Sequence, residues 1–156
     1  MLVVLRLLMA ACAVGALALA EGFTFTIGNP VASQDFQMKA AAFVFRTDGC
    51  PEPAKPQISA TAEGLVKGAR RSVALKVMAA SRPGVYAVFQ NWPAEGDWVV
   101  SLRGACASES AGAIVPIGSK GFDRESAKFF PRPATSAEIE TSLKVLAQSG
   151  HKGGSK

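Results

Sequence analysis

Alternation of apolar and polar side chains is the feature that most constrains the fold of this chain. Between Ser72 and Met78 the apolar residues Val73, Leu75 and Val77 occupy every second position, with Lys76 on the opposite side. The segment Trp98–Arg103 repeats the pattern. A period of two residues is that of a half-buried β-strand rather than a helix. The pattern at the centre of the chain therefore predicts strands of an antiparallel sheet.

Similar short segments recur on both sides of this centre, separated by turn sequences rich in proline and glycine. We expect further strands at Gly22–Ile27, Phe36–Thr47, Gln57–Ala62, Val85–Trp92 and Gly112–Ile117. Val85–Trp92 has apolar residues on both faces, which predicts a central position in its sheet. Pro116 indicates an edge position for the last strand, because proline cannot donate to a ladder. Many short strands with turns between them favour a mainly β sandwich.

The C-terminal part changes to a helical period. Phe129–Pro133 is predicted to be an extended connector, and Thr135 with Glu138 has the spacing of a capping box. Apolar residues then recur at helical spacing as far as Leu146, and Gly150 is expected to end the run. We therefore predict a helix at residues 135–149 that packs on the sandwich domain of residues 21–134, followed by a disordered tail at residues 150–156.

The first twenty residues predict export. They contain one early charge, Arg6, then an uncharged run to Ala20 with small residues near its end, which is the pattern of a cleavable signal peptide. We place the cleavage between Ala20 and Glu21, so that the protein would be secreted or periplasmic. An uncleaved anchor is the weaker alternative, because the run is shorter than the roughly 20 apolar residues of a membrane span. A lipoprotein signal at Cys12 is another.

Removal of the signal changes the cysteine count. The chain has three cysteines, and Cys12 lies in the signal, which leaves Cys50 and Cys106 in an oxidising compartment. We predict that these two form a disulfide. A redox or metal pair is the alternative, but the cysteines are far apart in sequence and no histidine is near either. No later segment is long and apolar enough to span a membrane, so the mature chain should lack a span.

The search for chemistry mostly returns exclusions. The single histidine, His151, lies in the predicted tail, and no phosphate loop, nucleophile elbow or calcium loop is present. We therefore expect no catalytic residue, no metal and no cofactor. The carboxylate pairs Glu95 with Asp97 and Asp123 with Glu125 are interpreted as solvated turn residues. The excess of 17 Lys and Arg over 12 Asp and Glu is spread along the chain and does not predict nucleic-acid binding.

Two groups of residues are candidates for a binding surface. Lys67, Arg70 and Arg71 fall in a predicted strand connection and could contact an anionic polysaccharide, lipid head groups or an acidic partner; a solvated hairpin is the simpler interpretation. Tyr86 and Trp92, with Trp98 nearby, could form an aromatic platform for a sugar or peptide. Core packing is the simpler interpretation here too, since large aromatic residues dominate sandwich cores.

The segment PGVYAV at Pro83–Val88, followed by PAEGDWVVSL at Pro93–Leu102, resembles the paired strands of immunoglobulin-like envelope domains, among them the YtkA and FixH-like families. The resemblance spans Pro83–Leu102. It implies an immunoglobulin-like antiparallel β-sandwich with the C-terminal α-helix added. Such families are often linked to copper handling or oxidase assembly, but this chain lacks histidine and clustered methionine in the domain, so only the fold is carried over.

The expected function is that of an exported, non-enzymatic binding or accessory module of the cell envelope. Its partner would be an envelope protein or a polyanionic or glycan surface. Two alternatives stay open. One is a structural, self-associating envelope or matrix protein, and the other is a carboxylate-based hydrolase of envelope polymers, which would need buried and converging Asp or Glu side chains.

Overall fold

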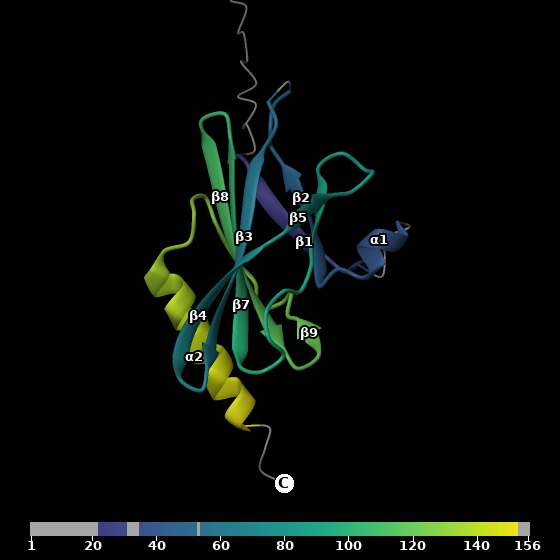
Figure 1. Cartoon of the computed structure of the whole chain (residues 1–156). Coiled ribbons are helices and arrows are strands. Elements are labelled where there is room, and N and C mark those ends of the chain that lie inside the picture. Colours follow the sequence, from purple (N-terminus) through teal and green to yellow (C-terminus); the bar gives the residue numbers. More distant parts are fainter. Residues whose placement is uncertain (1–21, 31–34, 53, 153–156) are drawn as a thin grey trace, which may run out of the picture.

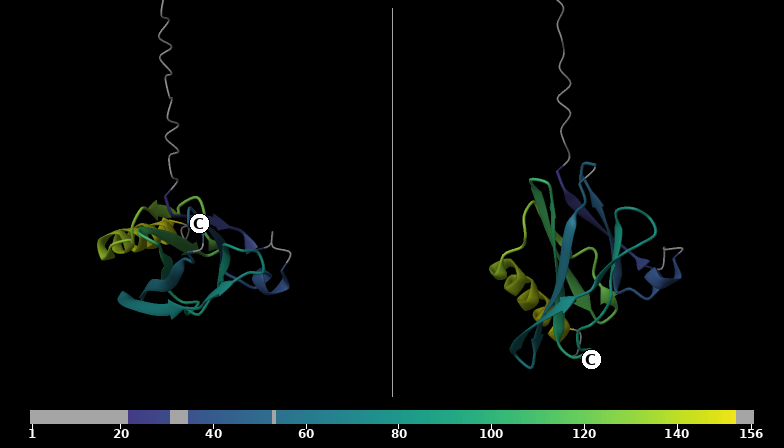
Figure 2. Two further views of the ribbon diagram at one scale, coloured as in Figure 1. Left: turned by 90° about the horizontal axis from the view of Figure 1, so that it is seen from above. Right: turned by 45° about the horizontal axis from the view of Figure 1, so that its top comes forward.

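The computed structural model describes residues 22–30, 35–52 and 54–152, and the side chains as far as Ser149. The predicted signal peptide and the cleavage position between Ala20 and Glu21 lie outside the described residues. The described chain forms two antiparallel sheets with a C-terminal helix, which confirms the mainly β sandwich (Figure 1). The helices α1 and α2 lie at opposite sides of the molecule (Figures 1 and 2).

Four strands form the smaller sheet, in the order β1-β2-β6-β5. Their bounds are Thr24–Gly28 for β1, Phe43–Asp48 for β2, Val77–Ala79 for β5 and Val85–Val88 for β6. The interior position of β6 agrees with the prediction from its sequence. Strand β6 is shorter than predicted, however, because the chain leaves the sheet after Val88, and Trp92 therefore lies in a loop.

The larger sheet has the order β10-β8-β7-β3-β4, with β9 pairing to β8. Its strands are, in chain order, β3 (Gln57–Val66), β4 (Ala69–Leu75), β7 (Asp97–Cys106), β8 (Glu109–Gly118), β9 (Gly121–Phe122) and β10 (Lys128–Phe130). The predicted connector at Phe129–Pro133 thus begins as a strand. Its first residues lie against β8, where Phe129 pairs with Ala113.

The core between the sheets comes from the inward side of the alternating pattern. Phe25, Phe43 and Phe45 from the smaller sheet meet Val100 and Leu102 from the larger one. The Phe25 and Phe45 rings contact edge to face, with centroids 5.5 Å apart. Burial of these apolar side chains is the main stabilising contribution to such a sandwich.

The predicted strand at Ser72–Met78 is in fact two strands in different sheets. Strand β4 ends at Leu75 in the larger sheet, and β5 begins at Val77 in the smaller sheet, so the chain crosses between the layers at Lys76. Val73, Leu75 and Val77 still pack against the shared core. Alternation identified the buried face correctly, but it carries no information about a change of partner strand.

The predicted strand at Phe36–Thr47 was wrong in its first part. Residues Phe36–Lys39 form the short helix α1, because the side chain of Asp35 accepts a hydrogen bond from the backbone N–H of Gln37 and caps the helix. Met38 is buried against the outer face of the smaller sheet with Ala41 and Ala87. Phe36, the first residue of α1, is 85% exposed.

The prediction that Pro116 marks an edge strand was also wrong, since β8 lies between β7 and both β9 and β10. Strand β10 pairs with β8 only as far as Ile114, and β9 begins to pair at Ile117. The carbonyl of Pro116 accepts a hydrogen bond from the N–H of Asp123, so the backbone N and C=O of Pro116 point toward β9 and β10 and away from β7. The N–H that proline lacks would therefore not have bonded to β7.

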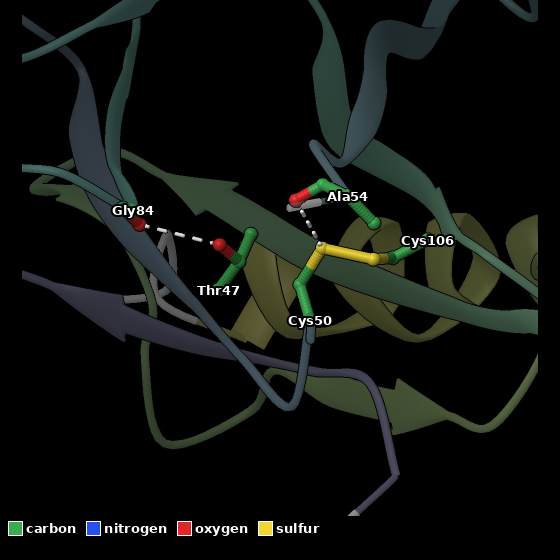
Figure 3. The surroundings of a disulfide bond; sticks show 5 residues. All are labelled: Thr47, Cys50, Ala54, Gly84 and Cys106. Atoms are coloured by element: carbon green, nitrogen blue, oxygen red, sulfur yellow. Dashed lines mark hydrogen bonds between the residues drawn. A yellow bond between two sulfur atoms is a disulfide. The ribbon is translucent and has the colours of Figure 1, made fainter. Parts of the chain in front are cut away.

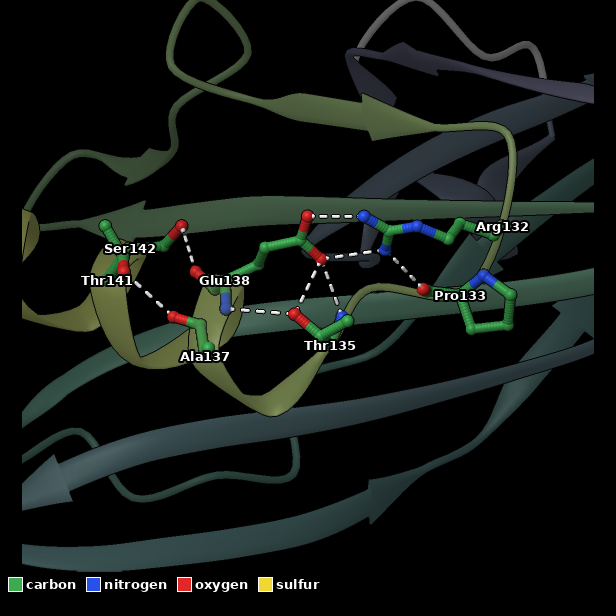
Figure 4. A network of polar contacts seen from close by, with 7 residues as sticks. All are labelled: Arg132, Pro133, Thr135, Ala137, Glu138, Thr141 and Ser142. Atoms are coloured by element: carbon green, nitrogen blue, oxygen red, sulfur yellow. Dashed lines mark hydrogen bonds and ion pairs between the residues drawn. The ribbon is translucent and has the colours of Figure 1, made fainter.

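Helix α2 (Ser136–Lys152) begins as the capping box predicts. The hydroxyl of Thr135 accepts from the N–H of Glu138, and the Glu138 carboxylate accepts from the N–H of Thr135 at 2.7 Å (Figure 4). Arg132 adds a second contact to the same carboxylate at 2.7 Å. The predicted end at Gly150 was wrong, because the helix continues through Gly150 to Lys152; residues 153–156 of the predicted tail lie outside the described chain.

The apolar side of α2 covers part of the outer face of the larger sheet. Ile139 and Leu143 pack against Val99 and Ile114, with Leu146 at the margin. The outer face is thereby divided into a region under the helix and a region beyond its N-terminal end.

The disulfide between Cys50 and Cys106 is present, as predicted (Figure 3). Cys50 lies two residues after β2 in the smaller sheet, and Cys106 is the last residue of β7 in the larger sheet. Their Cα atoms are 5.7 Å apart. The bond therefore links the two layers covalently.

Candidate functional site

A large concave region lies at the end of the sandwich opposite the disulfide. It is a cleft of about 840 Å³ between three segments: the loop of residues 90–97, the β8–β9 turn, and the last turns of α2. A cleft of this size is within the range of about 300–1,000 Å³ for small-ligand sites. Its lining consists of Gln90, Trp92, Pro93, Ala94, Gly96, Asp97, Trp98, Ile117, Gly118, Ser119, Gly121, Leu146 and Ser149.

The wall formed by residues 90–97 is held in place by hydrogen bonds at both ends. The indole N–H of Trp98 donates to the carbonyl of Glu95 at 2.9 Å, and the amide of Gln90 donates to the carbonyl of Trp92 at 3.3 Å. Gly96 has φ +98°, and a Cβ at this position would lie 2.6 Å from the carbonyl oxygen of Leu65. Only glycine combines this conformation with so close an approach to β3.

The cleft combines apolar surface with a few polar groups. Gln90, Ser119 and Ser149 provide neutral hydrogen-bonding groups, and Asp97 is the only ionisable residue among the described residues of its lining. The described part of the cleft can thus accommodate an apolar or neutral ligand, and Asp97 can accept hydrogen bonds from a positively charged group on that ligand.

The aromatic candidates do not form an exposed platform. Trp92 and Trp98 are 6% and 2% exposed and belong to the core, so only a small part of each borders the cleft. Tyr86 lies on β6, where its ring stacks on Phe45 with centroids 5.4 Å apart. Trp92 lies beyond the end of β6, so the prediction that it shares strand parity with Tyr86 was wrong.

The basic candidates lie on the β3–β4 hairpin, next to the wall of the cleft. Lys67 and Gly68 both have positive φ and form the two-residue turn, whereas Arg70 and Arg71 belong to β4. Lys67 pairs with Glu95 at 3.4 Å, and Arg70 pairs with Glu63 at 3.2 Å. Arg71 has no ion-pair partner among the described residues.

This pairing alters the interpretation of the hairpin as a site for polyanions. Two of its three cations already face a carboxylate. The hydrogen bond and charge of Lys144, with a smaller effect from the charge of Arg70, also lower the pKa of Glu140 on α2. Exposed pairs of this kind contribute little stability. They do reduce the positive potential that an anionic ligand would meet.

In the predicted pair of Asp123 with Glu125, the carboxylate of Asp123 holds a turn. Asp123 accepts hydrogen bonds from the Ser126 hydroxyl at 2.6 Å and from the backbone N–H groups of Ser126 and Glu125. The bonds from Ser126 lower the pKa of Asp123 below its usual value, the opposite of what a general acid needs. Within residues 22–30, 35–52 and 54–149, no Asp or Glu is buried, and no group of three potential metal-ligating side chains is brought together.

Sequence patterns did not reveal the cleft. Its three walls are far apart along the chain, and Ser119 and Ser149 are ordinary surface residues in sequence. The signals that were available are the glycines at positions 96, 118 and 121, which mark tight turns, and the loop sequence PAEGD.

A disulfide-braced antiparallel β-sandwich with an open cleft at one end is the class of protein that this fold and this site define. None of its described helices is both long enough and apolar enough to cross a membrane. Comparisons with protein-family models, curated proteins and solved structures find no match to this chain. Inference about its function therefore starts from its own residues.

Proposed function

We propose that this protein is an exported, non-enzymatic binding or accessory module of the cell envelope. The signal-like segment at residues 1–20 supports export, and the disulfide between Cys50 and Cys106 suits an oxidising compartment such as the periplasm or the cell exterior. The local resemblance to immunoglobulin-like envelope domains points to the same location.

The observation that carries the proposal is the end cleft. Its wall is fixed by the Trp98–Glu95 hydrogen bond and by the close packing of Gly96 on β3. A preformed wall lowers the entropy cost of binding. Rigid concave surfaces with an apolar floor and a few polar groups are typical of binding sites.

The lining favours a peptide segment of an envelope protein as the ligand. The apolar surface of Trp98, Ile117 and Leu146 suits a small apolar side chain, and Gln90 and Ser119 can bond to its backbone. Asp97 favours a nearby Lys or Arg on the partner and disfavours a polyanion at this end.

Self-association is the second candidate, and one observation supports it. Within the described chain, β4 pairs only with β3, so Ala69–Leu75 is an open edge of the larger sheet. Arg70 and Arg71 on this strand oppose pairing with a second copy, because like charges would meet.

Analytical ultracentrifugation distinguishes the binding module from the self-associating structural protein. The binding module is expected to be a monomer, and the structural protein is expected to form concentration-dependent oligomers. No structural observation supports the hydrolase alternative.

Site-specific photocrosslinking in intact cells tests the proposal. A photoreactive phenylalanine analogue replaces Ser119 at the rim of the cleft or, as the control, exposed Glu52 near the disulfide at the other end. We expect a discrete adduct with an envelope protein only from position 119, and its loss when Asp97→Lys is added. Equal adducts from both positions, or none from position 119, would contradict the proposal.

A further inference from the structure

A second concave region lies on the outer face of the larger sheet, beyond the N-terminal end of α2. It is an open groove of about 370 Å³ whose side-chain lining comes mainly from β3, β7 and β8. Along β7, the distance from the start of the strand at the end cleft to Arg103 is roughly 20 Å at 3.3 Å per residue. The groove is therefore separate from the end cleft.

Strand register places Arg103 at the centre of this groove. Arg103 pairs with Ser59 on β3 and with Gly112 on β8, and Ala105 pairs with Ser110 on β8. Alternation along β7 puts Arg103 on the same face as Val99, which α2 covers, but Arg103 itself is exposed.

Small residues around Arg103 create the hollow. Ser59, Ala105 and Ser110 rise little above the sheet, and Pro133 forms one wall. The wall is close because the connector to α2 passes directly over Gly112, where a Cβ would collide with the carbonyl oxygen of Arg132. The groove is therefore a fixed feature of the way in which α2 joins the sheet.

The absence of a carboxylate partner distinguishes Arg103 from three of the six other described arginines. Arg46, Arg70 and Arg132 each lie within 3.2 Å of a carboxylate oxygen. Among the described residues, Arg103 has no carboxylate partner and the groove has no acidic residue in its lining. Its guanidinium is thus available for a bidentate contact with an external anion.

We propose that this groove binds an acidic sugar unit of an anionic polysaccharide, with Arg103 contacting the carboxylate. Gln57, Ser59 and Ser110 supply neutral donors and acceptors beside the single cation, which matches a ligand with one acid group among several hydroxyl groups. A polyphosphate would favour several clustered cations instead. The groove would hold the module on an envelope glycan while the end cleft, near the other end of α2, engages a protein.

Affinity electrophoresis in gels containing polygalacturonate tests this proposal, with a neutral glucan gel as the reference. We expect retardation of the wild-type mature domain only by polygalacturonate at roughly physiological salt. Arg103→Gln should weaken binding at least tenfold, since hydrogen bonds to charged groups are worth about 1.5–3 kcal/mol. The affinity of Arg103→Lys should lie between those of the wild type and Arg103→Gln, because lysine keeps the charge but loses the bidentate geometry.

Arg82→Gln is the matched control, since it removes the same charge from an exposed arginine that also has no ion-pair partner among the described residues. It should leave binding unchanged within about twofold, because exposed charges farther apart than the Debye length of roughly 8 Å are largely screened. Equal loss in Arg82→Gln and Arg103→Gln would show a non-specific charge effect and overturn the proposal.

Two further outcomes decide the ligand class. If the double substitution Ser59→Ala and Ser110→Ala weakens polygalacturonate binding, the neutral contacts that define a sugar site are supported. If inorganic phosphate competes as well as galacturonate at equal concentration, the sugar assignment is wrong. Loss of glycan binding leaves the crosslink at position 119 unaffected, so failure of this proposal is distinct from failure of the end cleft.

Discussion

The indole of Trp98 lies directly over Gly64 on the neighbouring strand. The two residues are paired in the β3–β7 register, and a Cβ at position 64 would lie 2.5 Å from two ring atoms of Trp98. The absence of a side chain on β3 is therefore what allows Trp98 to be buried there. Because the same indole anchors the wall of the end cleft through Glu95, packing at Gly64 also positions the candidate site.

Gly64→Ala should destabilise the protein by about 1–3 kcal/mol, as overpacking of a core does. The expected result is a lower urea midpoint and a shift in tryptophan fluorescence in the folded state. Gly118→Ala is the control. A Cβ added at position 118 would lie 3.8 Å from its nearest neighbour, so this variant should have nearly the wild-type free energy of unfolding. Equal stability of the two variants would contradict the packing described for Trp98.

Reduction of the disulfide should lower the free energy of unfolding by about 4 kcal/mol, the chain-entropy value for the 56-residue separation of Cys50 and Cys106. Urea unfolding with and without reductant measures the difference. The double variant Cys50→Ala and Cys106→Ala should be insensitive to reductant and resemble the reduced protein. An unchanged midpoint on reduction of the wild type would show that the brace adds no stability.

Glu138 should give the folded protein a specific dependence on acid pH. The Arg132 guanidinium, with the N–H and hydroxyl of Thr135, lowers the pKa of Glu138 from 4.5 to about 2. A lowered pKa stabilises the folded state above the unfolded value, and this contribution is lost as the pH falls from about 4.5 through about 2. The carboxyl chemical shift of Glu138, followed by NMR, should titrate near pH 2.

The matched stability experiment compares Glu138→Gln with the wild type across the same range. The variant should be less stable near neutral pH, and the difference should shrink as the pH falls toward 2. Glu52→Gln, at an exposed loop position, is the control and should show no such convergence. A difference that is constant with pH would contradict the role of the Arg132–Glu138 contact.

At Ser101 we predict a substitution that does not destabilise the protein. Its side chain is 2% exposed beneath α2, and its hydroxyl has no hydrogen-bond partner among the described residues. An unpaired buried hydroxyl costs about 1–3 kcal/mol, so Ser101→Ala should leave the free energy of unfolding unchanged or raise it. Ser142→Ala should lower it slightly, because the Ser142 hydroxyl donates to the Glu138 carbonyl. A clear loss of stability in Ser101→Ala would indicate a missing partner for this hydroxyl.

Local patterns carried much of the fold but little of the candidate site. Alternation located the buried faces of β4 and β7, and the spacing of Thr135 and Glu138 located the start of α2. The same patterns missed α1, whose start depends on a single cap at Asp35, and the change of sheet at Lys76. Both depend on contacts that short-range periodicity does not encode.

The concave regions were beyond sequence reasoning for a related reason. The end cleft joins Asp97, Ser119 and Ser149, which only the tertiary fold brings together. Arg103 is one outward residue of a strand, and its open surroundings depend on where α2 begins and on the connector passing over Gly112. In contrast, the disulfide could be predicted. Removal of the signal with Cys12 leaves two cysteines in an oxidising compartment, and two cysteines allow only one pairing.

Intact mass spectrometry of the protein purified from its native compartment, with and without reduction, tests the account of an exported, disulfide-braced module most directly. We expect a chain that begins at Glu21 and gains two hydrogen atoms on reduction, as one bond between Cys50 and Cys106 requires. A chain that retains residues 1–20, or one with both thiols free before reduction, would contradict it.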